Sequence, residues 1–379
     1  MGVQLGFVST YPPTQCGLAT FTASLYEAMT GPGLDAGVVV RLLDAELVHS
    51  ATPPGAQLVM DDHPGIEASA QRLNRCDAVI LQHEFGVYGG RDGEDVLRLL
   101  AQLRVPTIVV LHTVLANPAP HQRTVLEAVV AAADAVVTMT LAAHNRLDAG
   151  YAVDMSKVSI IAHGAPALRP PAARALRPRF SDGTPIVLTW GLLGPGKGIE
   201  WGIEAMALLS DVQPAPHYVI AGKTHPKVVA REGEAYREGL TVRMRGLGVA
   251  TSVRFDAQYR DAAALTELVD SADVVLLPYD STDQVTSGVL IEAVAAGKPV
   301  VATEFPHAVE LLSGGAGIVV PHRDPVAIAA ALHRILTRRD VAASMAAKAA
   351  ATTAQVHWPA IAAQYRQLVG RVISEGIAA

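Results

Sequence analysis

Short apolar runs alternate along this chain with longer stretches of helical composition. In the first half each run is apolar at nearly every position, instead of alternating with polar residues. Continuous apolar runs are typical of parallel strands whose sheet is covered by helices on both faces. The pattern predicts six strands here: Val3–Ser9, Gly37–Leu43, Ala78–Gln82, Thr107–Leu111, Ala135–Met139 and Val158–Ala162.

The second half repeats this arrangement. Its six predicted strands are Ile186–Trp190, Tyr218–Ala221, Ser252–Phe255, Val274–Leu277, Val300–Thr303 and Gly317–Val320. Two sets of alternating strands and helices predict an α/β protein with two Rossmann-like, doubly wound parallel-sheet domains. Ligands bind such sheets at the carboxyl ends of the strands, so we expect the two domains to face each other across a cleft.

A proline- and arginine-rich stretch separates the two halves. Residues 166–185 include Pro170, Pro171 and Pro178, and such a segment cannot hold a strand ladder. We therefore expect a first domain at 1–165, a linker at 166–185 and a second domain at 186–355. The last segment, 356–379, should contain a helix from Trp358 to Ile373.

Composition narrows the class of protein. A chain of 379 residues with 50% apolar residues is long enough for two hydrophobic cores. The net charge of −6, without a basic cluster, argues against a nucleic-acid partner. Two cysteines give neither a disulfide framework nor metal-ligand spacing. The chain has no apolar run near the roughly 18 residues of a membrane span and no signal-peptide pattern at its start, so we expect a cytoplasmic protein without a transmembrane segment.

The most informative segment begins after the apolar run that ends at Pro278. A polar turn follows, and a helix is predicted to begin near Ser287 and to end at Gly297. A helix that starts behind a buried strand directs unpaired backbone amides, here those of Ser287, Gly288 and Val289, at one point, which favours a phosphate. Glu292, on the same helix, is placed to accept hydrogen bonds from ligand hydroxyls. A diphosphate beside a ribose would satisfy both parts.

This segment resembles the nucleotide-sugar motif of the retaining glycosyltransferases of family 4, which have the GT-B fold. In that family two glutamates eight positions apart bracket a Gly-containing turn and contact the donor sugar and the ribose. The second corresponds to Glu292 here, but the first falls on Gln284, and the usual glycine falls on Ser287, with Gly288 next to it. The resemblance also implies that the C-terminal helix crosses back to the first domain.

A second phosphate-binding candidate is the loop Gly191–Gly198. It nearly matches a P-loop at Gly196 and Lys197, but Gly198 stands where the hydroxyl that binds Mg²⁺ is needed, which argues against a nucleoside-triphosphatase. The loop instead resembles the Arg…Lys-Gly loop of family 4, whose two cations hold the donor diphosphate. Lys197 matches the lysine, and Leu192 replaces the arginine. Lys223, after the next strand, is a candidate replacement, with a solvated side chain as the alternative.

The first domain contributes a loop with Cys16 and Gly17 after its first strand, which looks like the family's glycine loop beside the donor phosphates. A cysteine nucleophile is disfavoured because no Cys–His pair is suggested. His83 and Glu84 follow the third predicted strand, and His112 ends the fourth. The resemblance places His112 against the donor sugar, and Glu84 is a candidate for polarising the acceptor hydroxyl.

Two further features are weaker. His163 falls where the family has an Asn-Gly pair at the hinge, and either a structural or a ligand-binding role fits it. Asp61 and Asp62 form an acidic pair, but we expect no strand to lead into them and interpret them as a loop.

The resemblance implies transfer of a hexose from a nucleotide-diphosphate sugar to a sugar, lipid-linked or small-molecule acceptor, without a metal or cofactor. Retention by double displacement requires two carboxylates about 5 Å apart, and the sequence assigns no such pair. The resemblance implies same-face attack, the usual explanation for this class. Three alternatives remain within the same fold: a sugar-nucleotide epimerase, a phosphorylase, and a nucleotide-sugar-binding protein without transfer activity.

Overall fold

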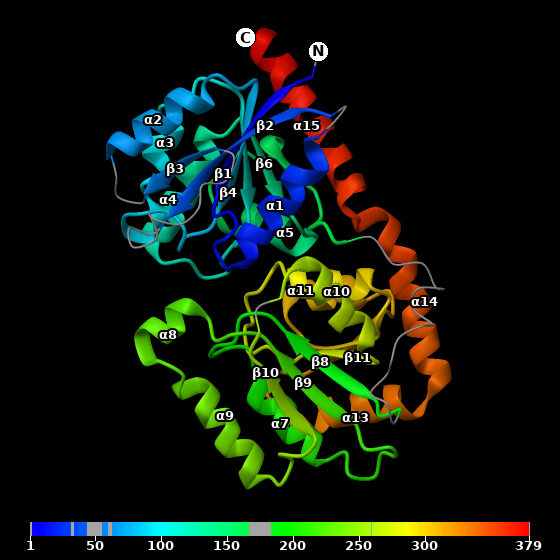
Figure 1. Ribbon diagram of the computed structural model, residues 1–379. Helices are drawn as coiled ribbons and strands as arrows, with labels where there is room; N and C mark the ends of the chain where they lie inside the picture. The colour runs from blue at the N-terminus through cyan, green and yellow to red at the C-terminus, as the bar shows by residue number, and fades with distance from the viewer. Residues whose placement is uncertain are drawn as a thin grey trace. The chain divides into compact units, whose positions relative to one another are not determined.

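The computed structural model describes residues 2–31, 34–43, 55–59, 63–166, 183–258 and 260–378. The chain divides into two compact units (Figure 1). Unit 1 comprises Met1–Gly164 together with Trp358–Ala379, and unit 2 comprises Ala165–His357. Most of the segment expected to be a linker, residues 167–182, lies outside the described residues, as do Asp61 and Asp62.

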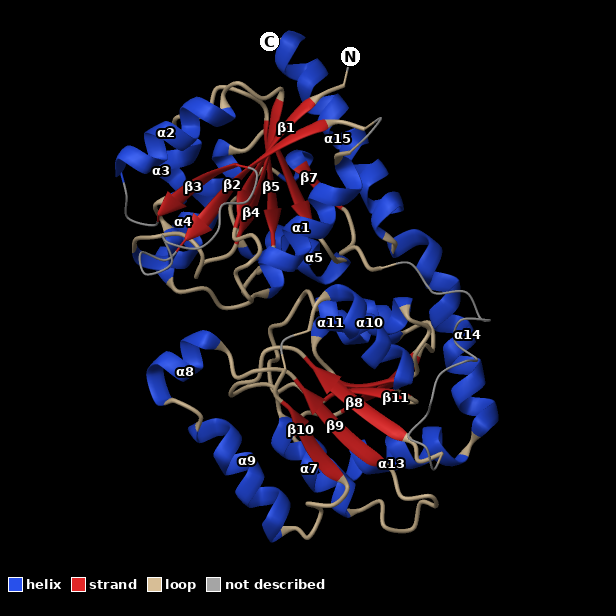
Figure 2. Cartoon of the chain, in the orientation of Figure 1, coloured by secondary structure: helices blue, strands red, loops and turns tan. Residues whose placement is uncertain are grey.

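Unit 1 contains a parallel sheet in the order β3-β2-β1-β4-β5-β6-β7 (Figure 2). Its strands are β1 (Gln4–Ser9), β2 (Ala36–Leu43), β3 (Gly55–Val59), β4 (Ala78–His83), β5 (Thr107–Leu111), β6 (Ala135–Thr138) and β7 (Val158–Ile160). The strand order reverses direction between β1 and β4, so the loops after these two strands diverge at a topological switch point.

The helices of unit 1 follow its strands, except for the last helix of the chain. They are α1 (Gly17–Met29), α2 (His63–Leu73), α3 (Val96–Leu100), α4 (Pro120–Ala132), α5 (Leu141–Gly150) and α15 (Trp358–Ala378). Helices α1 and α15 pack on one face of the sheet, where Phe21, Leu25, Ile361 and Tyr365 share a core with strand residues such as Phe7. The C-terminal helix thus completes the core of unit 1.

Unit 2 has a parallel sheet in the order β10-β9-β8-β11-β12-β13. Its strands are β8 (Ile186–Trp190), β9 (His217–Ala221), β10 (Val253–Asp256), β11 (Val274–Leu277), β12 (Val300–Thr303) and β13 (Gly317–Val320). The switch point of this sheet lies between β8 and β11.

Helices cover both faces of this second sheet. They are α7 (Ile199–Ala207), α8 (Pro226–Glu232), α9 (Ala235–Gly246), α10 (Ala262–Ser271), α11 (Gly288–Ala295), α12 (Pro306–Leu312), α13 (Pro325–Thr337) and α14 (Arg339–Val356). Ile203 of α7, Leu240 of α9 and Leu332 of α13 belong to one core. Leu290 of α11 and Leu312 of α12 belong to the other. Both faces are therefore apolar, as the continuous apolar strands predicted.

The expected α/β class with two Rossmann-like domains is confirmed, and all twelve predicted strands exist with ends shifted by at most two residues. One strand was missed. Strand β3 (Gly55–Val59) contains Gly55 and Gln57 and lacks a long apolar run, so its pattern is weak. The expectation that no strand precedes Asp61 was therefore wrong, because β3 ends at Val59.

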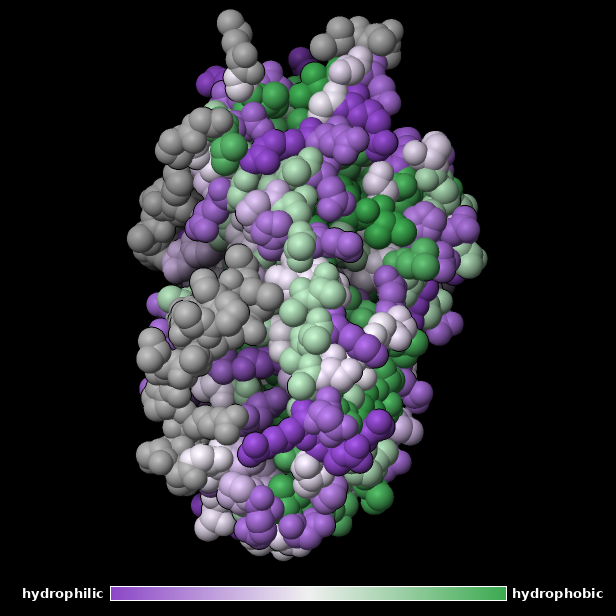
Figure 3. Space-filling model, turned by 90° about the vertical axis from the view of Figure 1, so that its right-hand side faces the viewer, coloured by the Kyte–Doolittle hydropathy of each residue, from purple (hydrophilic) through white to green (hydrophobic). Residues whose placement is uncertain are grey.

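Exposed large apolar side chains are scattered over several elements, with Val242 of α9 and Val326 of α13 among the most exposed. Figure 3 shows one face of the molecule, on which green hydrophobic residues form several groups separated by purple and white ones. Scattered exposed apolar residues are normal on a protein surface. Among the helices that the structure describes, none is long and apolar enough to cross a membrane.

Candidate functional site

Most of the predicted site residues of unit 2 lie in two loops at its switch point or at the start of the helix after one of them. The loop Gly191–Gly198 follows β8, and the segment Pro278–Ser287 follows the neighbouring strand β11. The two loops are joined by a hydrogen bond of 3.0 Å from the Asp280 amide to the Gly196 carbonyl oxygen. The sheet thus brings together the two segments that the sequence identified separately.

Ser287 is the N-cap residue of α11, and its Oγ accepts a hydrogen bond of 3.2 Å from the Leu290 amide. The Ser287 amide itself donates to Nδ1 of His307, at 2.8 Å. Our expectation that this amide faces a ligand therefore differs from the structure. Within the described residues, the amides of Gly288 and Val289 have no hydrogen-bond acceptor, so these two remain available to an anion.

Glu292 lies in the second turn of α11 and forms a hydrogen bond with the side chain of Trp190, the last residue of β8. Burial raises the pKa of the Glu292 carboxyl group to about 7, against the lowering effect of the Trp190 hydrogen bond. A carboxyl group with this pKa exchanges its proton near neutral pH, and a ligand that donates hydrogen bonds to it would favour the ionised form.

Lys197 is held over an aromatic ring. Its Nζ lies 4.3 Å from the centroid of the Tyr279 ring, and Tyr279 in turn stacks on Phe305, with ring centroids 5.3 Å apart. Gly198 next to it has φ +60°, and a Cβ there would collide with the Pro278 carbonyl oxygen. Only glycine therefore allows the Lys197 loop to pack this closely on the segment after β11.

The remaining predicted donor-binding residues of unit 2 are less engaged. The Gln284 side-chain amide donates to the Thr286 carbonyl oxygen at 3.1 Å, so it folds back on its own turn. The Lys223 side chain is exposed, and the Lys223 carbonyl oxygen accepts a hydrogen bond of 2.8 Å from the Leu193 amide. Lys223 follows β9, and the neighbouring residue Thr224 forms a β-bridge with Leu193 of the Gly191–Gly198 loop. No contact of the Lys223 side chain within the described residues indicates an anion-binding site.

In unit 1, His112 follows β5 and lies beside Gln82 of β4. The distance from His112 Nε2 to Gln82 Oε1 is 2.8 Å, so Nε2 carries the proton and Nδ1 is left as an acceptor. Burial, with smaller contributions from His163 and His83, lowers the pKa of His112 to about 3. A neutral imidazole with a bare Nδ1 can accept a hydrogen bond from a sugar hydroxyl.

The other two histidines of this region are also neutral. Burial lowers the pKa of His83 to about 4, and both of its ring nitrogens lack a hydrogen-bond partner in the described part of the chain. Burial likewise lowers the pKa of His163 to about 4, although its Nδ1 donates to the Gly164 carbonyl oxygen at 2.6 Å. His163 packs edge-on against Phe21 and next to Trp358, which favours the structural role for it.

Glu84 is held at the end of β4. Its Oε2 accepts a hydrogen bond of 2.5 Å from the Thr113 hydroxyl, and its Oε1 accepts one of 3.1 Å from the Phe85 amide. Thr113 directly follows His112, so the predicted acid and the predicted histidine are linked through neighbouring loops. The structure therefore brings His112, Glu84 and His83 to one edge of the unit 1 sheet.

The glycine loop of unit 1 lies on the other side of that switch point, after β1. Gly17 is the exposed first residue of α1, and Cys16 is its N-cap residue, with Sγ accepting from the Ala19 amide at 3.4 Å. The Cys16 thiol also lies 3.2 Å from the Thr10 hydroxyl. Cys16 thus has a capping function at the start of α1.

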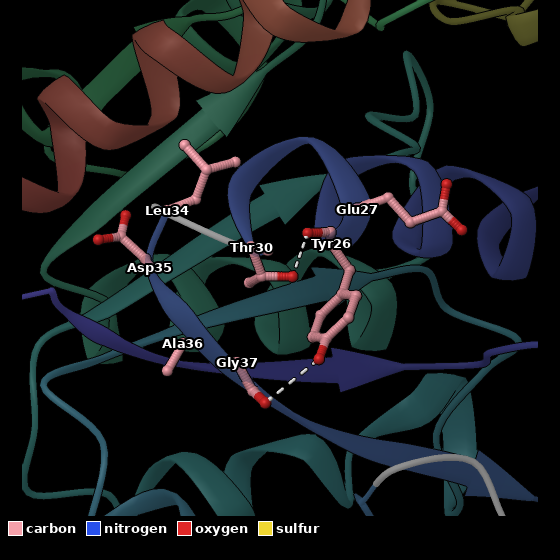
Figure 4. A pocket seen from close by; sticks show the side chains of 8 residues that line it. Tyr26, Glu27, Thr30, Leu34, Asp35, Ala36 and Gly37 are labelled. Atoms are coloured by element: carbon pink, nitrogen blue, oxygen red, sulfur yellow. Dashed lines mark hydrogen bonds between the residues drawn. The ribbon is translucent and has the colours of Figure 1, made fainter.

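A hollow of about 470 Å³ lies elsewhere in unit 1, between the end of α1 and the start of β2 (Figure 4). Tyr26 and Thr30 line it, with the Tyr26 hydroxyl donating to the Gly37 carbonyl oxygen at 3.3 Å. Strand β2 begins at this end, so the hollow is at the amino-terminal edge of the sheet, away from the predicted site residues. We therefore do not assign it to the site. Across the described ranges, His, Cys, Asp and Glu side chains form no group of three that could hold a metal ion.

Residues 184–338 match the family model of the glycosyl transferases group 1. This segment holds every predicted site residue of unit 2, from Gly196 to Glu292.

Curated relatives carry one activity. The D-inositol 3-phosphate glycosyltransferase of Geodermatophilus obscurus is 30% identical over 237 residues, which are 59% of this chain and 50% of the relative. The enzyme of the same name from Streptomyces bingchenggensis is 31% identical over 257 residues, 61% of this chain and 54% of the relative. The chain thus spans about half the length of the curated relatives it matches.

Solved structures share the GT-B fold with this chain. HepE from Anabaena, solved in complex with UDP and glucose, has a TM-score of 0.76 at 18% identity, covering 97% of this chain and 100% of that one. Sucrose-phosphate synthase from Thermosynechococcus elongatus has a TM-score of 0.74 at 20% identity, covering 98% and 100%. At these identities the likeness concerns the fold.

The sequence did not reveal four side chains that hold the site residues in place: Gln82, Trp190, Tyr279 and His307. Each acts on a partner distant in sequence, as in the pairing of Trp190 with Glu292. The sequence signal that could have identified two of them is their place at strand ends, where ligands bind such sheets: Trp190 ends β8, and Tyr279 follows β11 by two residues.

Proposed function

We propose that this protein is a retaining glycosyltransferase that moves a hexose from a nucleotide-diphosphate sugar, of the GDP-mannose or UDP-glucose type, to a hydroxyl acceptor. The observation that carries the proposal is the switch point of unit 2. There Lys197 lies in the loop after β8, while the free amides of Gly288 and Val289 and the partly buried Glu292 carboxyl group lie on α11, after the neighbouring strand β11.

This set of groups matches the chemistry of a nucleoside diphosphate. Backbone amides at the start of α11 and a nearby lysine suit the negative charge of the diphosphate. Glu292, once ionised, suits the two hydroxyls of a ribose. The family match over residues 184–338 supports the same assignment.

The reaction then proceeds by same-face attack. The acceptor hydroxyl approaches the sugar carbon from the side on which the diphosphate leaves, and a departing phosphate oxygen takes the proton. Charge accumulates on the leaving diphosphate in the transition state, so donors that are already in place lower the barrier. Lys197 and the amides of Gly288 and Val289 have this role in the proposal, with Gly196 shaping the loop.

Unit 1 serves the sugar and the acceptor. His112 accepts a sugar hydroxyl at its bare Nδ1, because Gln82 holds the proton on Nε2. Glu84 orients the acceptor hydroxyl, and the glycine loop at Gly17 lies at the same switch point. The curated relatives act on D-inositol 3-phosphate, which makes this compound the first acceptor to test. We further propose a cytoplasmic location and no requirement for metal.

Gln284 and Leu192 favour one alternative, a protein that binds a nucleotide sugar without transferring it. The family has charged residues at both places, and the Gln284 side chain is bonded to Thr286. A calorimetric titration with UDP-glucose and GDP-mannose, followed by transfer and donor-hydrolysis assays, distinguishes the two. Binding with transfer supports the proposal, and proton NMR of the product shows whether the anomeric configuration is retained. Binding without transfer to any acceptor supports the alternative, and no binding refutes both.

A further inference from the structure

The start of α12 lies against the turn that precedes α11. His307, the second residue of α12, is 3% exposed, and its Nδ1 accepts the hydrogen bond of 2.8 Å from the Ser287 amide. The His307 backbone amide donates to the carbonyl oxygen of Gln284 at 3.4 Å. One residue of α12 thus contacts both ends of the Gln284–Ser287 turn.

These contacts fix the state of the imidazole. Because Nδ1 accepts a hydrogen bond from an amide, the proton of the neutral ring is on Nε2. His307 also has a further interaction within the described part of the chain. Its ring is therefore held in one orientation.

The contact with Ser287 decides which amides of α11 can meet a ligand. A helix begins with several amides that have no partner inside the helix. Here the Ser287 amide points to His307, and the Leu290 amide points to Ser287 Oγ. The amides of Gly288 and Val289 lie between them and have no acceptor in the described residues. The hydrogen bonds of the Ser287 and Leu290 amides thus fix the backbone on either side of Gly288 and Val289, and with it the direction in which these two amides point.

Phe305, which directly precedes α12, packs beneath Lys197, the other phosphate-binding candidate of this site. Phe305 is fully buried and stacks on Tyr279, the ring that carries Lys197. Phe305 and His307, two residues apart, therefore contact both parts of the site: Phe305 packs on the ring beneath Lys197, and His307 binds the Gln284–Ser287 turn. Sequence reasoning gave no role to either residue.

We propose that His307 is a positioning residue for nucleotide-diphosphate binding, which holds the Gln284–Ser287 turn so that the amides of Gly288 and Val289 face the phosphates. The inference rests on the proposed function, and it adds a residue to the site that contacts no ligand. It requires a hydrogen-bond acceptor at the place of Nδ1, and not merely a side chain of similar volume.

Three substitutions separate these requirements. In His307→Asn, Oδ1 replaces Nδ1 at nearly the same place. In His307→Gln, the acceptor moves to the place of Nε2, and in His307→Leu the volume is kept without an acceptor. Without any ligand, amide hydrogen exchange at Ser287 should stay slow in the Asn variant and become about tenfold faster or more in the other two, because a buried amide loses its partner.

Binding is then measured by calorimetry with UDP and with GDP. For the nucleotide that the parent binds, we expect the Asn variant to stay within about threefold of the parent and the Gln and Leu variants to bind about tenfold or more weakly. In the transfer assay the Gln and Leu variants should show both a higher KM for the donor and a lower kcat, since the amides of Gly288 and Val289 bind the diphosphate before and during its departure.

The outcomes distinguish this inference from the proposed function. If the parent binds UDP or GDP and all three variants bind alike, or if Asn fails as badly as Leu, His307 does not act through its acceptor and the inference is overturned. Unchanged exchange at Ser287 in the Gln and Leu variants overturns it as well, whatever the ligand. If the parent binds neither nucleotide, the proposed function itself fails.

Discussion

The side chain of Trp190 forms a hydrogen bond with the partly buried carboxyl group of Glu292, across the switch point from β8 to α11. Burial has the larger effect on this carboxyl group and raises its pKa to about 7. Since ribose hydroxyls would bind its ionised form, protonation of Glu292 and donor binding should be linked.

The first prediction concerns stability. The folded protein keeps the Glu292 proton up to about pH 7, whereas the unfolded chain loses it near pH 4.5. The unfolded state therefore binds fewer protons in this window, and the contribution of Glu292 to the free energy of unfolding falls as pH rises through it. Urea denaturation at pH 5 and pH 8 should show a smaller decrease for Glu292→Gln than for the parent. The exposed Glu304→Gln serves as the control and should behave like the parent.

The second prediction concerns binding by the same residue. Glu292→Ala should weaken donor binding by about 1–3 kcal/mol, because ribose hydroxyls lose a charged partner. Below pH 7 the parent should release a proton on binding, which calorimetry in buffers of different ionisation enthalpy detects. Equal affinity in parent and variant, or proton release that persists in Glu292→Ala, would show that another group holds the ribose.

The third prediction is that Lys197 acts mainly on the leaving diphosphate. Lys197→Ala should lower kcat more than it raises the KM of the donor, since charge on the diphosphate grows in the transition state. Steady-state kinetics with varied donor concentration measures the split. Lys348→Ala removes an exposed lysine of α14 and should leave both constants unchanged. Parent-like kcat in Lys197→Ala would refute the role, and recovery of kcat with Mg²⁺ would show that charge alone was lost.

The fold was largely predictable because its strands are apolar throughout. Runs such as Val300–Thr303 are buried throughout, and their short length and β-branched residues favour a strand over a buried helix. Strand β3 departs from this rule, since Gly55 and Gln57 interrupt its apolar residues. Pairing with β2 supplies what the local pattern lacks, and such pairing cannot be read from five residues.

The candidate site was predictable only in part. The positions of Lys197, Glu292 and His112 follow from their places at strand and helix ends, which local sequence shows. The side chains that hold these three residues in place cannot be identified from local sequence. His307 lies 20 residues from Ser287, and no periodicity relates one to the other. The use of the Ser287 amide by His307, which corrects the predicted set of three free amides, depends on that tertiary contact.

The fourth prediction tests the close approach of two loops in unit 2. Gly198→Ala should destabilise the fold by about 3 kcal/mol, because the residue has φ +60° and its new Cβ would meet the Pro278 carbonyl oxygen. Gly196→Ala is the matched control, since its φ is +88° but open space surrounds the Cβ. Gly196→Ala should lower the free energy of unfolding only by the strain of placing alanine at a positive φ. Chemical denaturation compares them, and equal losses would mean that the collision is relieved by a small shift of the loop.

The last prediction separates His112 from Glu84. His112 follows a fully buried strand and is fixed by Gln82, so we expect it to lie against the reacting sugar. Glu84 is bonded to Thr113 and Phe85 and is assigned to the acceptor hydroxyl. Donor hydrolysis and transfer both require the sugar to develop positive charge, but only transfer requires the acceptor to be oriented.

His112→Ala should therefore suppress transfer and donor hydrolysis together, whereas Glu84→Gln should impair transfer and leave slow hydrolysis largely intact. Release of the nucleotide diphosphate, measured with and without acceptor, reports both rates for each variant. Glu84→Gln keeps the size of the side chain and its ability to accept from Thr113, so a loss of transfer would reflect the missing charge. If Glu84→Gln abolishes hydrolysis while His112→Ala spares it, the two roles are reversed: the carboxylate stabilises the charged sugar, and the neutral imidazole orients the acceptor.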